Sequence, residues 1–346
     1  MIFSKILNHW YSNNKRELPW RQTKNPYFIW LSEIILQQTQ VNQGLPYYMA
    51  FIEEFPTVFD LAKAKESKVL KLWQGLGYYS RARNLHVTAK YIVDVLNGRF
   101  PDNYQDLLKL KGVGDYTASA IASICYNESS AVVDGNVYRV LSRYFGIETP
   151  INTTKGFKEF KLLAQELIDT KDPAEYNQAI MEFGAVQCKP QNPVCESCPF
   201  QTSCVAFEKK IIPQLPVKNK PNKASKKHFN FLVILSKDQK TIFEKRQGKG
   251  IWQNLYQFPL IESKKELLHR EIMVVLKDNK FLKDNLFEVS LFNETVITHK
   301  LSHQHLYTKF WIISVDEIKQ EGISVKDIHN YPVPILISNF IDDFNF

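Results

Sequence analysis

Apolar residues in the first 207 positions follow a helical period. They recur at intervals of three and four residues, and clusters of Gly, Pro and Asn separate the runs. Strand-like alternation is scarce, so we expect an all-α domain over residues 1–207. The expected helices span 1–14, 28–39, 45–54, 66–74, 81–96, 104–110, 115–125, 136–145, 157–169 and 174–185.

The pattern changes after residue 207. Residues 208–228 are rich in Lys and Pro, which is typical of an extended, solvated linker, although such a segment could also follow a phosphate backbone. Beyond it, FNFLVILS, TIFEKR and HLYTKFWIIS are rich in β-branched and aromatic residues, and KDQK at 237–240 predicts the turn between the first two. With a helix expected at 264–277, residues 229–346 should form an α+β domain.

Composition and charge narrow the class of protein. With 346 residues and 44% hydrophobic positions, the chain is long enough for two folded domains. Its 44 Lys and Arg against 36 Asp and Glu give a net charge of +8, which favours a polyanionic partner such as nucleic acid. No apolar run is long enough to cross a membrane and the first residues do not form a signal peptide, so we expect an intracellular protein.

One carboxylate lies in an unusually apolar run. In YFIWLSEIILQQTQ, residues 27–40, Glu33 follows Trp30 and Leu31 and precedes Ile34. On a helix, Glu33 could point to water while its neighbours face the core. Alternatively it is desolvated, which would raise its pKa and let it act as a general acid near neutral pH. The run by itself leaves both interpretations open.

Four of the five cysteines are clustered, at Cys188, Cys195, Cys198 and Cys204. Disulfides are rare in a reducing compartment, so this cluster predicts a metal site. Zinc and an iron–sulfur cluster both accept four thiolates. The spacing C-x6-C-x2-C-x5-C differs from the paired CxxC…CxxC of a zinc ribbon.

Two further motifs each precede an expected helix. The first is LKGVGDYTASAIAS, residues 110–123, in which Gly112 and Gly114 can adopt positive φ. Such a turn would leave the N–H groups at the start of the next helix open to a phosphate. Alternatively, the turn simply joins two ordinary helices. In AVVDGNVYRVLSR, residues 131–143, Asp134 could simply cap the following helix, or cap it and also serve catalysis.

These motifs stand in register with a known family. ELPWR, WLSEIILQQTQV, FPTVFDLAKA, LWQGLGYYSRARNLH, DGNVYRVLSR and NQAIMEFGAVQC resemble segments of MutY-type adenine DNA glycosylases, within the endonuclease III or helix-hairpin-helix superfamily. The match is dense through residue 204 and thinner across 229–346. It implies a helix-hairpin-helix DNA glycosylase fold with an iron–sulfur loop, followed by a Nudix-like domain that recognises 8-oxoguanine.

The resemblance implies a monofunctional adenine DNA glycosylase of base excision repair. Such an enzyme hydrolyses the N-glycosidic bond of adenine paired with 8-oxoguanine or guanine in double-stranded DNA, and it leaves an abasic site. It carries a 4Fe–4S cluster, here on the four clustered cysteines. We further expect a monomer in the bacterial cytoplasm, associated with the nucleoid and without a membrane partner.

The family pattern also assigns roles in catalysis. Glu33 matches the general acid that protonates N7 of adenine, and Asp134 matches the ionised carboxylate that stabilises the oxocarbenium-like sugar. Tyr116 and Asn136 match residues that shape the hydrogen-bond network of the acid. Bifunctional relatives carry a Schiff-base lysine where this chain has Tyr116, and Lys111 does not match that position.

Other matches lie near the adenine or along the DNA. They are Arg21, Gln38, Thr39, Tyr78, Gly112, Gly114 and Glu182. Gln38 matches the residue that enters the base stack, and Tyr78 matches an aromatic wedge beside it. Alternatively, Tyr78 and Tyr79 are ordinary core residues.

In the second domain, GIWQNLYQFPL resembles a segment of the family's Nudix-like domain. Residues 264–277 lack the clustered glutamates of Nudix hydrolases, so we expect no pyrophosphohydrolase activity. In THKLSHQHLY, Ser302 and His303 match residues that contact 8-oxoguanine. Leu301 replaces a phenylalanine of the family, which leaves the preference for 8-oxoguanine over guanine open.

Three alternatives remain. His299, His303 and His305 could hold a metal, although no nearby Cys or carboxylate completes such a site. The chain could be a glycosylase-lyase for oxidised pyrimidines, against which Tyr116 and the second domain argue. It could also be a DNA-binding module without catalysis, against which the presence of both Glu33 and Asp134 argues.

Overall fold

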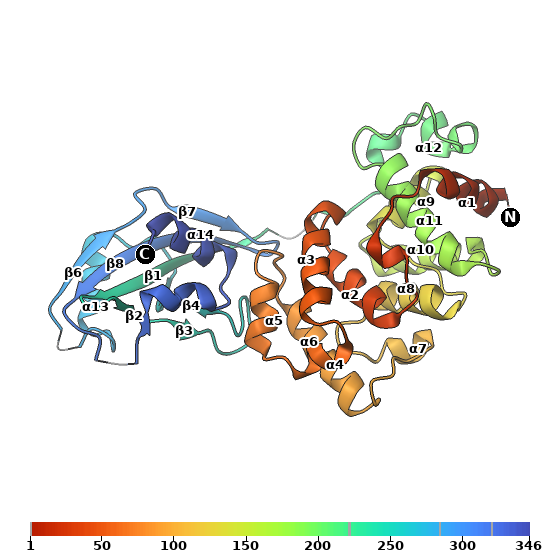
Figure 1. Ribbon diagram of the computed structural model, residues 1–346. Helices are drawn as coiled ribbons and strands as arrows, with labels where there is room; N and C mark the ends of the chain where they lie inside the picture. The colour runs from red at the N-terminus through yellow and green to blue at the C-terminus, as the bar shows by residue number, and fades with distance from the viewer. Residues whose placement is uncertain (1, 221–222, 284, 320) are drawn as a thin grey trace. The chain divides into compact units, whose positions relative to one another are not determined.

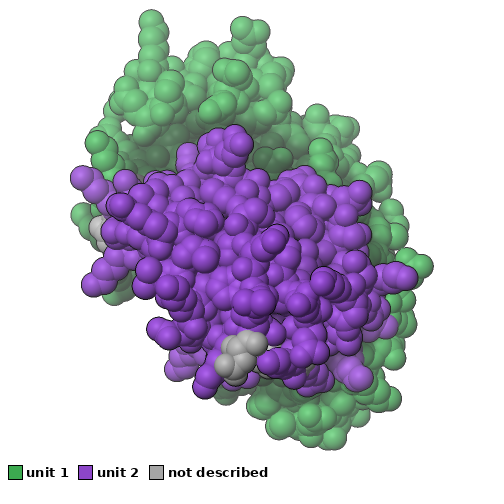
Figure 2. Space-filling view, turned by 90° about the vertical axis from the view of Figure 1, so that its left-hand side faces the viewer, with its two compact units in different colours: residues 1–63, 84–220 green, residues 64–83, 221–346 purple. Residues whose placement is uncertain are grey.

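The computed structural model describes residues 2–220, 223–283, 285–319 and 321–346 (Figure 1). The chain forms two compact units, which Figure 2 colours separately. Unit 1 comprises residues 1–63 and 84–220, and unit 2 comprises residues 64–83 and 221–346. Pro221 and Asn222, two residues of the expected linker, lie outside the described residues.

Unit 1 is helical, as the apolar spacing predicted. Its longer helices are α1 (Ile2–Asn14), α2 (Pro26–Leu36), α3 (Val41–Glu54), α8 (Asp115–Tyr126), α9 (Gly135–Phe145), α10 (Thr154–Leu167) and α11 (Pro173–Glu182). Its shorter elements are α4 (Val58–Lys63), α7 (Tyr104–Leu107), α12 (Val205–Glu208), the 3-10 helices Pro19–Arg21, Gln201–Ser203 and Ile212–Gln214, and the π-helical turn Phe183–Gln187. Helix α6 (Ser80–Asp94) begins in unit 2 and continues in unit 1. The sequence did not predict α4 and α12, because elements this short leave no periodic pattern.

Helices α2 and α8 lie in the core of unit 1. Helix α2 buries nearly every side chain from Tyr27 to Ile35, so it is enclosed on all sides. Helix α8 buries every residue from Thr117 to Ile124, and the small Ala and Ser side chains among them let α2 and α11 pack closely against it. A polar residue in the middle of α2 therefore has no solvated face to occupy.

Two helix ends lie next to residues with a predicted functional role, Gln38 and Asp134. Helix α2 ends at Leu36, three residues earlier than expected, because Gln38 adopts a φ of +57° that cannot continue a helix. Helix α9 begins after Asp134, whose carboxylate accepts hydrogen bonds from the backbone N–H groups of Asn136 (2.9 Å) and Val137 (2.8 Å). Asp134 is thus a helix cap, as both of its interpretations required.

Unit 2 is built on a mixed sheet. Strands β1 (Ser225–Ser236) and β8 (Gln304–Val315) pair in parallel along their whole length. The strand order is β6-β8-β1-β2-β9, with β5 paired to β1 and β7 paired to β8. The other strands are β2 (Lys240–Thr241), β5 (Leu260–Ser263), β6 (Phe287–Leu291), β7 (Ile297–Lys300) and β9 (Ile323–Ser324), with β3 (Glu244–Lys245) and β4 (Tyr256–Gln257) as a separate pair.

Helices cover both faces of this sheet. On one face, Leu232 and Trp311 belong to a core cluster that includes Ile272 of α13 (His269–Lys277). On the other face, the ring of Phe310 stacks on Phe340 of α14 (Ile335–Phe344), with 4.0 Å between ring centroids. Unit 2 is therefore the α+β fold that the strand pattern predicted. None of the helices in the described parts of the chain is long and apolar enough to span a bilayer.

Three details of unit 2 differ from the sequence prediction. TIFEKR is not one strand, because β2 pairs with β1 and β9 whereas β3 pairs with β4, so the chain changes sheets after Thr241. The helix expected at 264–277 begins only at His269. Helix α14 was not predicted.

Residues 64–83, which include α5 (Glu66–Leu72), group with unit 2. The hydroxyl of Tyr79 donates to the carbonyl of Val333 at 3.0 Å, and Arg83 Nη1 donates to the carbonyl of Gln253 at 2.9 Å. The sequence placed this segment in the helical domain, because its local pattern is helical and does not reveal which core it contacts.

The expected linker packs against unit 1 over part of its length. Leu215 is buried and its carbonyl accepts a hydrogen bond from Arg143 Nε at 3.1 Å. The carbonyl of Val217 accepts one from the backbone N–H of Ile151 at 3.0 Å. Residues 215–217 are therefore not a free, solvated tether.

Candidate active site

A cavity of about 160 Å³ in unit 1 brings together most of the residues with a predicted role near the base. Those that line it are Arg21, Glu33, Thr39, Tyr116, Asp134, Asn136 and Glu182. They come from α2, α8, α9, α11 and the turns between helices, so segments far apart in the sequence build the site.

Glu33 is buried, with 7% of its surface exposed. Burial raises its pKa to about 7, because the charged form is poorly solvated inside the protein. A hydrogen bond with Tyr116 and the charge of Arg21 favour the ionised form, while the charge of Asp134 opposes it. The desolvated interpretation of Glu33 therefore holds, and the solvated one was wrong.

Asp134 has more partners than Glu33 that favour its ionised form. Burial raises its pKa overall, and its two cap hydrogen bonds and the charge of Arg139 limit that rise. Asn136 Nδ2 also donates to its carboxylate at 2.7 Å. Asn136 is fixed in turn, since its Oδ1 accepts from Arg139 Nη2 at 2.8 Å.

Tyr116 lies between the acid and a thioether. Its hydroxyl hydrogen-bonds with Glu33 and lies 3.2 Å from the sulfur of Met181. Burial, together with the charges of Glu33 and Asp134, raises the pKa of Tyr116 well above its usual value. The phenol therefore stays neutral and can donate to Glu33.

Glu182 forms the strongest ion-pair network of the site. Arg16 contacts it through the backbone N–H (3.0 Å), Nε (2.7 Å) and Nη2 (2.7 Å), and Arg21 Nη2 donates to it at 2.7 Å. Burial would raise the pKa of Glu182, but these hydrogen bonds outweigh it and lower the pKa to about 2. Sequence reasoning missed Arg16 and Arg139, because local pattern does not show which distant groups an arginine side chain contacts.

The Gly-Val-Gly turn lies between α7 and α8. Gly112 has a φ of +83°, and a Cβ there would lie 2.8 Å from the Cβ of Asn84, so this position requires glycine. Gly114 precedes α8 in an ordinary extended conformation, with no atom near the place of a side chain. Both glycines are exposed, so the N–H groups at the start of α8 are open to an anion.

Gln38 and Thr39 form the turn after α2. Gln38 is exposed in its left-handed conformation, whereas Thr39 lines the cavity and donates its N–H to the carbonyl of Leu36 at 3.1 Å. A strained, exposed residue beside a cavity is consistent with a contact to a bound molecule.

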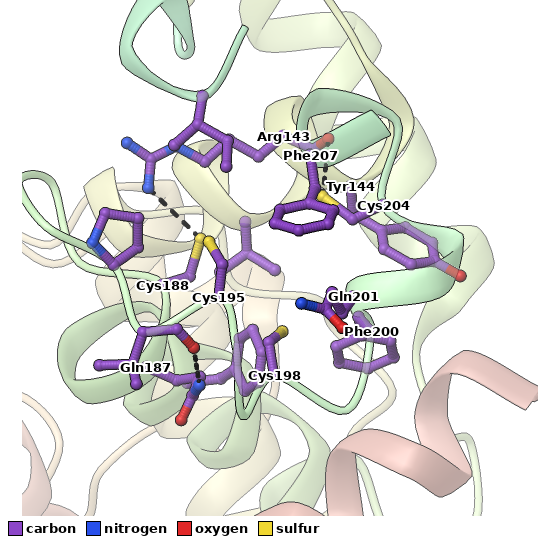
Figure 3. Close-up of a pocket in the computed structure, with 15 residues that line it drawn as sticks. Arg143, Tyr144, Gln187, Cys188, Cys195, Cys198, Phe200, Gln201, Cys204 and Phe207 are labelled. Carbon is purple, nitrogen blue, oxygen red and sulfur yellow. Dashed lines mark hydrogen bonds between the residues drawn. The ribbon is translucent and has the colours of Figure 1, made fainter. Parts of the chain in front are cut away.

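The four clustered cysteines line one pocket, together with Arg143 (Figure 3). Arg143 Nη1 lies 3.5 Å from the sulfur of Cys188, and its carbonyl lies 3.5 Å from the sulfur of Cys204. Burial raises the pKa of Cys198 to about 11. Across the described residues, no three His, Cys, Asp or Glu side chains converge closely enough to hold a metal ion, and this includes His299, His303 and His305.

The remaining predicted residues meet in a second cavity, of about 490 Å³, within unit 2. Tyr78 lines it from residues 64–83, and Ser302 and His303 line it from the turn between β7 and β8. Tyr78 is 53% exposed, with a φ of +45°, whereas Tyr79 is buried. The core interpretation therefore holds for Tyr79 and was wrong for Tyr78.

Both units resemble known proteins. Residues 31–165 match the HhH-GPD superfamily of base excision DNA repair proteins, and residues 230–343 match the NUDIX domain. The chain is 38% identical to adenine DNA glycosylase of Buchnera aphidicola subsp. Baizongia pistaciae, over 90% of this chain and 86% of that protein. It is 33% identical to the enzyme of subsp. Schizaphis graminum over 99% of both chains. Among solved structures, a thermostable thymine-DNA glycosylase is similar, with a TM-score of 0.56 and 31% identity over 60% of this chain and 96% of that one.

Proposed function

Since this chain belongs to the adenine DNA glycosylase family, we propose that it excises adenine from double-stranded DNA and leaves an abasic site. The observation that carries the proposal is the pair of unequal carboxylates in the unit 1 cavity. Glu33 has a pKa raised to about 7, and Asp134 is stabilised as an anion by a helix N-terminus and Asn136. A glycosidase needs such a pair, with one acid and one anion.

Glu33 supplies the proton. Adenine leaves poorly as an anion and readily once a ring nitrogen is protonated. An ordinary glutamic acid, with a pKa near 4.3, is almost fully ionised at neutral pH, whereas Glu33 is about half protonated at pH 7. Glu33 transfers its proton to N7 while the C1′–N9 bond breaks and its electron pair moves to the adenine. General acid catalysis of this kind contributes about 10²–10⁴ in rate.

Asp134 stabilises the positive charge that the departing base leaves on the sugar. Its carboxylate needs little rearrangement to do so, because the start of α9 and Asn136 fix it. Water then adds to C1′, and the proton that it loses passes to Glu33. The products are free adenine and an abasic site, and Glu33 is protonated again.

The enzyme is monofunctional in this proposal. Bifunctional relatives in the superfamily open the sugar through a lysine at the position of Tyr116. The phenol of Tyr116 cannot form a Schiff base, and its hydroxyl already hydrogen-bonds with Glu33. Strand cleavage by this chain should therefore require added alkali.

We assign a 4Fe–4S cluster to Cys188, Cys195, Cys198 and Cys204. All four line one pocket, four thiolates are the ligand set that such a cluster takes, and the C-x6-C-x2-C-x5-C spacing differs from that of a zinc ribbon. The cluster would tie together the loop that precedes α12, and the glycosidic step does not need it as a reactant.

The cavity of unit 2 supports recognition of the base opposite adenine. Exposed polar side chains at Ser302 and His303 share it with the half-exposed ring of Tyr78. Such a set can hydrogen-bond and stack on a purine, so we assign it to 8-oxoguanine or guanine. We also infer a monomer that acts on the chromosome in the bacterial cytoplasm.

The test is single-turnover excision of adenine from duplexes with 8-oxoguanine, guanine or thymine opposite. Wild type is compared with Glu33→Gln, and with Glu166→Gln as a control for an exposed glutamate on α10. Alkali-dependent breaks that are fastest opposite 8-oxoguanine and lost only in Glu33→Gln support the proposal. Breaks without alkali would contradict the monofunctional assignment. Tight DNA binding without adenine release would contradict the whole proposal.

A further inference from the structure

The chain reaches Asp134 through residues 127–133, which belong to no helix or strand. Residues 131–133 are buried, so their backbone N–H and C=O groups need partners inside the protein. Side chains from the neighbouring helices provide partners for both backbone groups of Ala131 and for the N–H of Val132. The position of Asp134 therefore depends on residues far from it in sequence.

Two amide side chains hold part of this segment. Gln165 on α10 accepts from the N–H of Ala131 at 3.0 Å and donates to the carbonyl of Ser129 at 2.7 Å. Asn177 on α11 is fully buried and contacts the N–H of Val132 at 3.1 Å. Each side-chain amide thus satisfies backbone groups that a neighbouring strand would pair in a sheet.

Lys161 is a third side chain that holds this segment, and it also contacts α8. Its ammonium donates to the carbonyl of Ala131 at 2.7 Å, to Ser119 Oγ at 2.9 Å and to Asp115 Oδ2 at 3.0 Å. These three bonds use all three N–H donors of the lysine. Asp115 is the first residue of α8 and precedes Tyr116. Lys161 and Asp115 are both mostly buried, with side-chain exposures of 20% and 21%.

We propose that Lys161 is a positioning residue that fixes Tyr116 and Asp134 relative to one another. One ammonium joins the start of α8, which carries the partner of Glu33, to the backbone three residues before Asp134. Both groups must be in place for one reaction, so a small displacement between them slows it. The inference rests on the roles proposed above for Glu33 and Asp134.

The test compares Lys161→Met with Lys161→Arg. Lys158→Met serves as the control, because Lys158 is an exposed lysine on the same helix. We expect Lys161→Met to lower the single-turnover rate at saturating enzyme by about 10- to 100-fold, the loss that misplaced groups typically cause. The Kd for DNA should stay within about twofold of wild type, because no DNA contact is removed. Lys161→Arg should recover part of the rate.

A purely structural role predicts something else. In that case Lys161→Met lowers the melting temperature but leaves the rate of the folded fraction unchanged, which would overturn the proposal. An Arg variant as slow as the Met variant would overturn it too. Should Lys161→Met fail to fold, Asp115→Ala removes the ion pair to the first residue of α8 while the ammonium keeps its bonds to Ser119 and Ala131, and an unchanged rate would then reject the proposal. Inactivity of wild type on every mispair would instead reject the proposed function.

Discussion

Glu33 and Asp134 line the same cavity, but only Asp134 caps a helix. Glu33 lies in the middle of α2, where backbone N–H groups are already paired within the helix, so none is free to stabilise its charge. Asp134 lies at the start of α9, where N–H groups are unpaired and the helix dipole favours an anion. Their different positions on a helix therefore explain why Glu33 suits the role of acid and Asp134 that of anion.

The rate of excision should fall as pH rises through about 7. Glu33 must be protonated to act, and its pKa is raised to about 7. Well above that value, each pH unit should lower the single-turnover rate about tenfold, because the protonated fraction falls in proportion. Rates measured across this range on a duplex with 8-oxoguanine test the sign. A rate that rises through pH 7 would mean that Glu33 acts as a base.

The stability of the protein should also depend on pH through the titration of Glu33. The folded pKa of Glu33 is about 7, against about 4.3 when unfolded, so the folded state binds the extra proton between these values. Its favourable contribution is complete below pH 4.3 and disappears as pH rises through about 7, a loss of up to about 4 kcal/mol. Glu33→Gln should therefore raise the melting temperature at pH 8 more than at pH 5. An equal shift at both values would contradict this account.

Asp134→Asn should separate stability from activity. Asparagine caps helices about as well as aspartate, so unfolding free energy should change by less than about 1 kcal/mol. The anion that faces the sugar is lost, however, and excision should slow by about 10²–10³. Chemical denaturation and single-turnover kinetics on one preparation measure both. Retained activity would exclude a charge-stabilising role for Asp134.

Glu182 should stabilise the protein in the opposite pH direction from Glu33. Burial raises its pKa, but Arg16 and Arg21 lower it to about 2, so its contribution is present above the unfolded pKa of about 4.3 and is lost as pH falls toward 2. Glu182→Gln leaves two arginines without a counter-charge and should cost about 3 kcal/mol at pH 7. Urea denaturation at pH 7 and pH 3 compares the variant with wild type. A difference that grows at low pH would refute the ion pair as the cause.

Iron removal should affect the loop around the cysteines. Cys198→Ser should lose the visible absorbance of the cluster and lower the melting temperature by more than about 5 °C, the shift for a loss of about 2 kcal/mol in a domain of this size. Cys125→Ser is the matched control, because Cys125 does not line the cysteine pocket. Metal analysis decides between iron and zinc. Stoichiometric zinc in wild type would contradict the cluster.

The sequence determined the features that depend on local pattern. Helical spacing predicted most helices of unit 1, and the β-branched and aromatic residues of β1 and β8 predicted the centre of the sheet. The turn chemistry of Asp134 predicted a helix cap, and the cysteine spacing predicted a shared site. Each of these signals lies within a few neighbouring residues.

Only the tertiary structure decided what depends on packing between distant segments. The burial of Glu33 follows from the enclosure of α2, which includes its packing against α8, and the charge of Glu182 follows from Arg16 and Arg21, some 160 residues away in the chain. Tyr78 and Tyr79 are neighbours in sequence and both line the unit 2 cavity, yet Tyr78 is half-exposed and Tyr79 is buried. A pKa or a side-chain role reflects every group that surrounds the residue in space, and local pattern does not specify those groups.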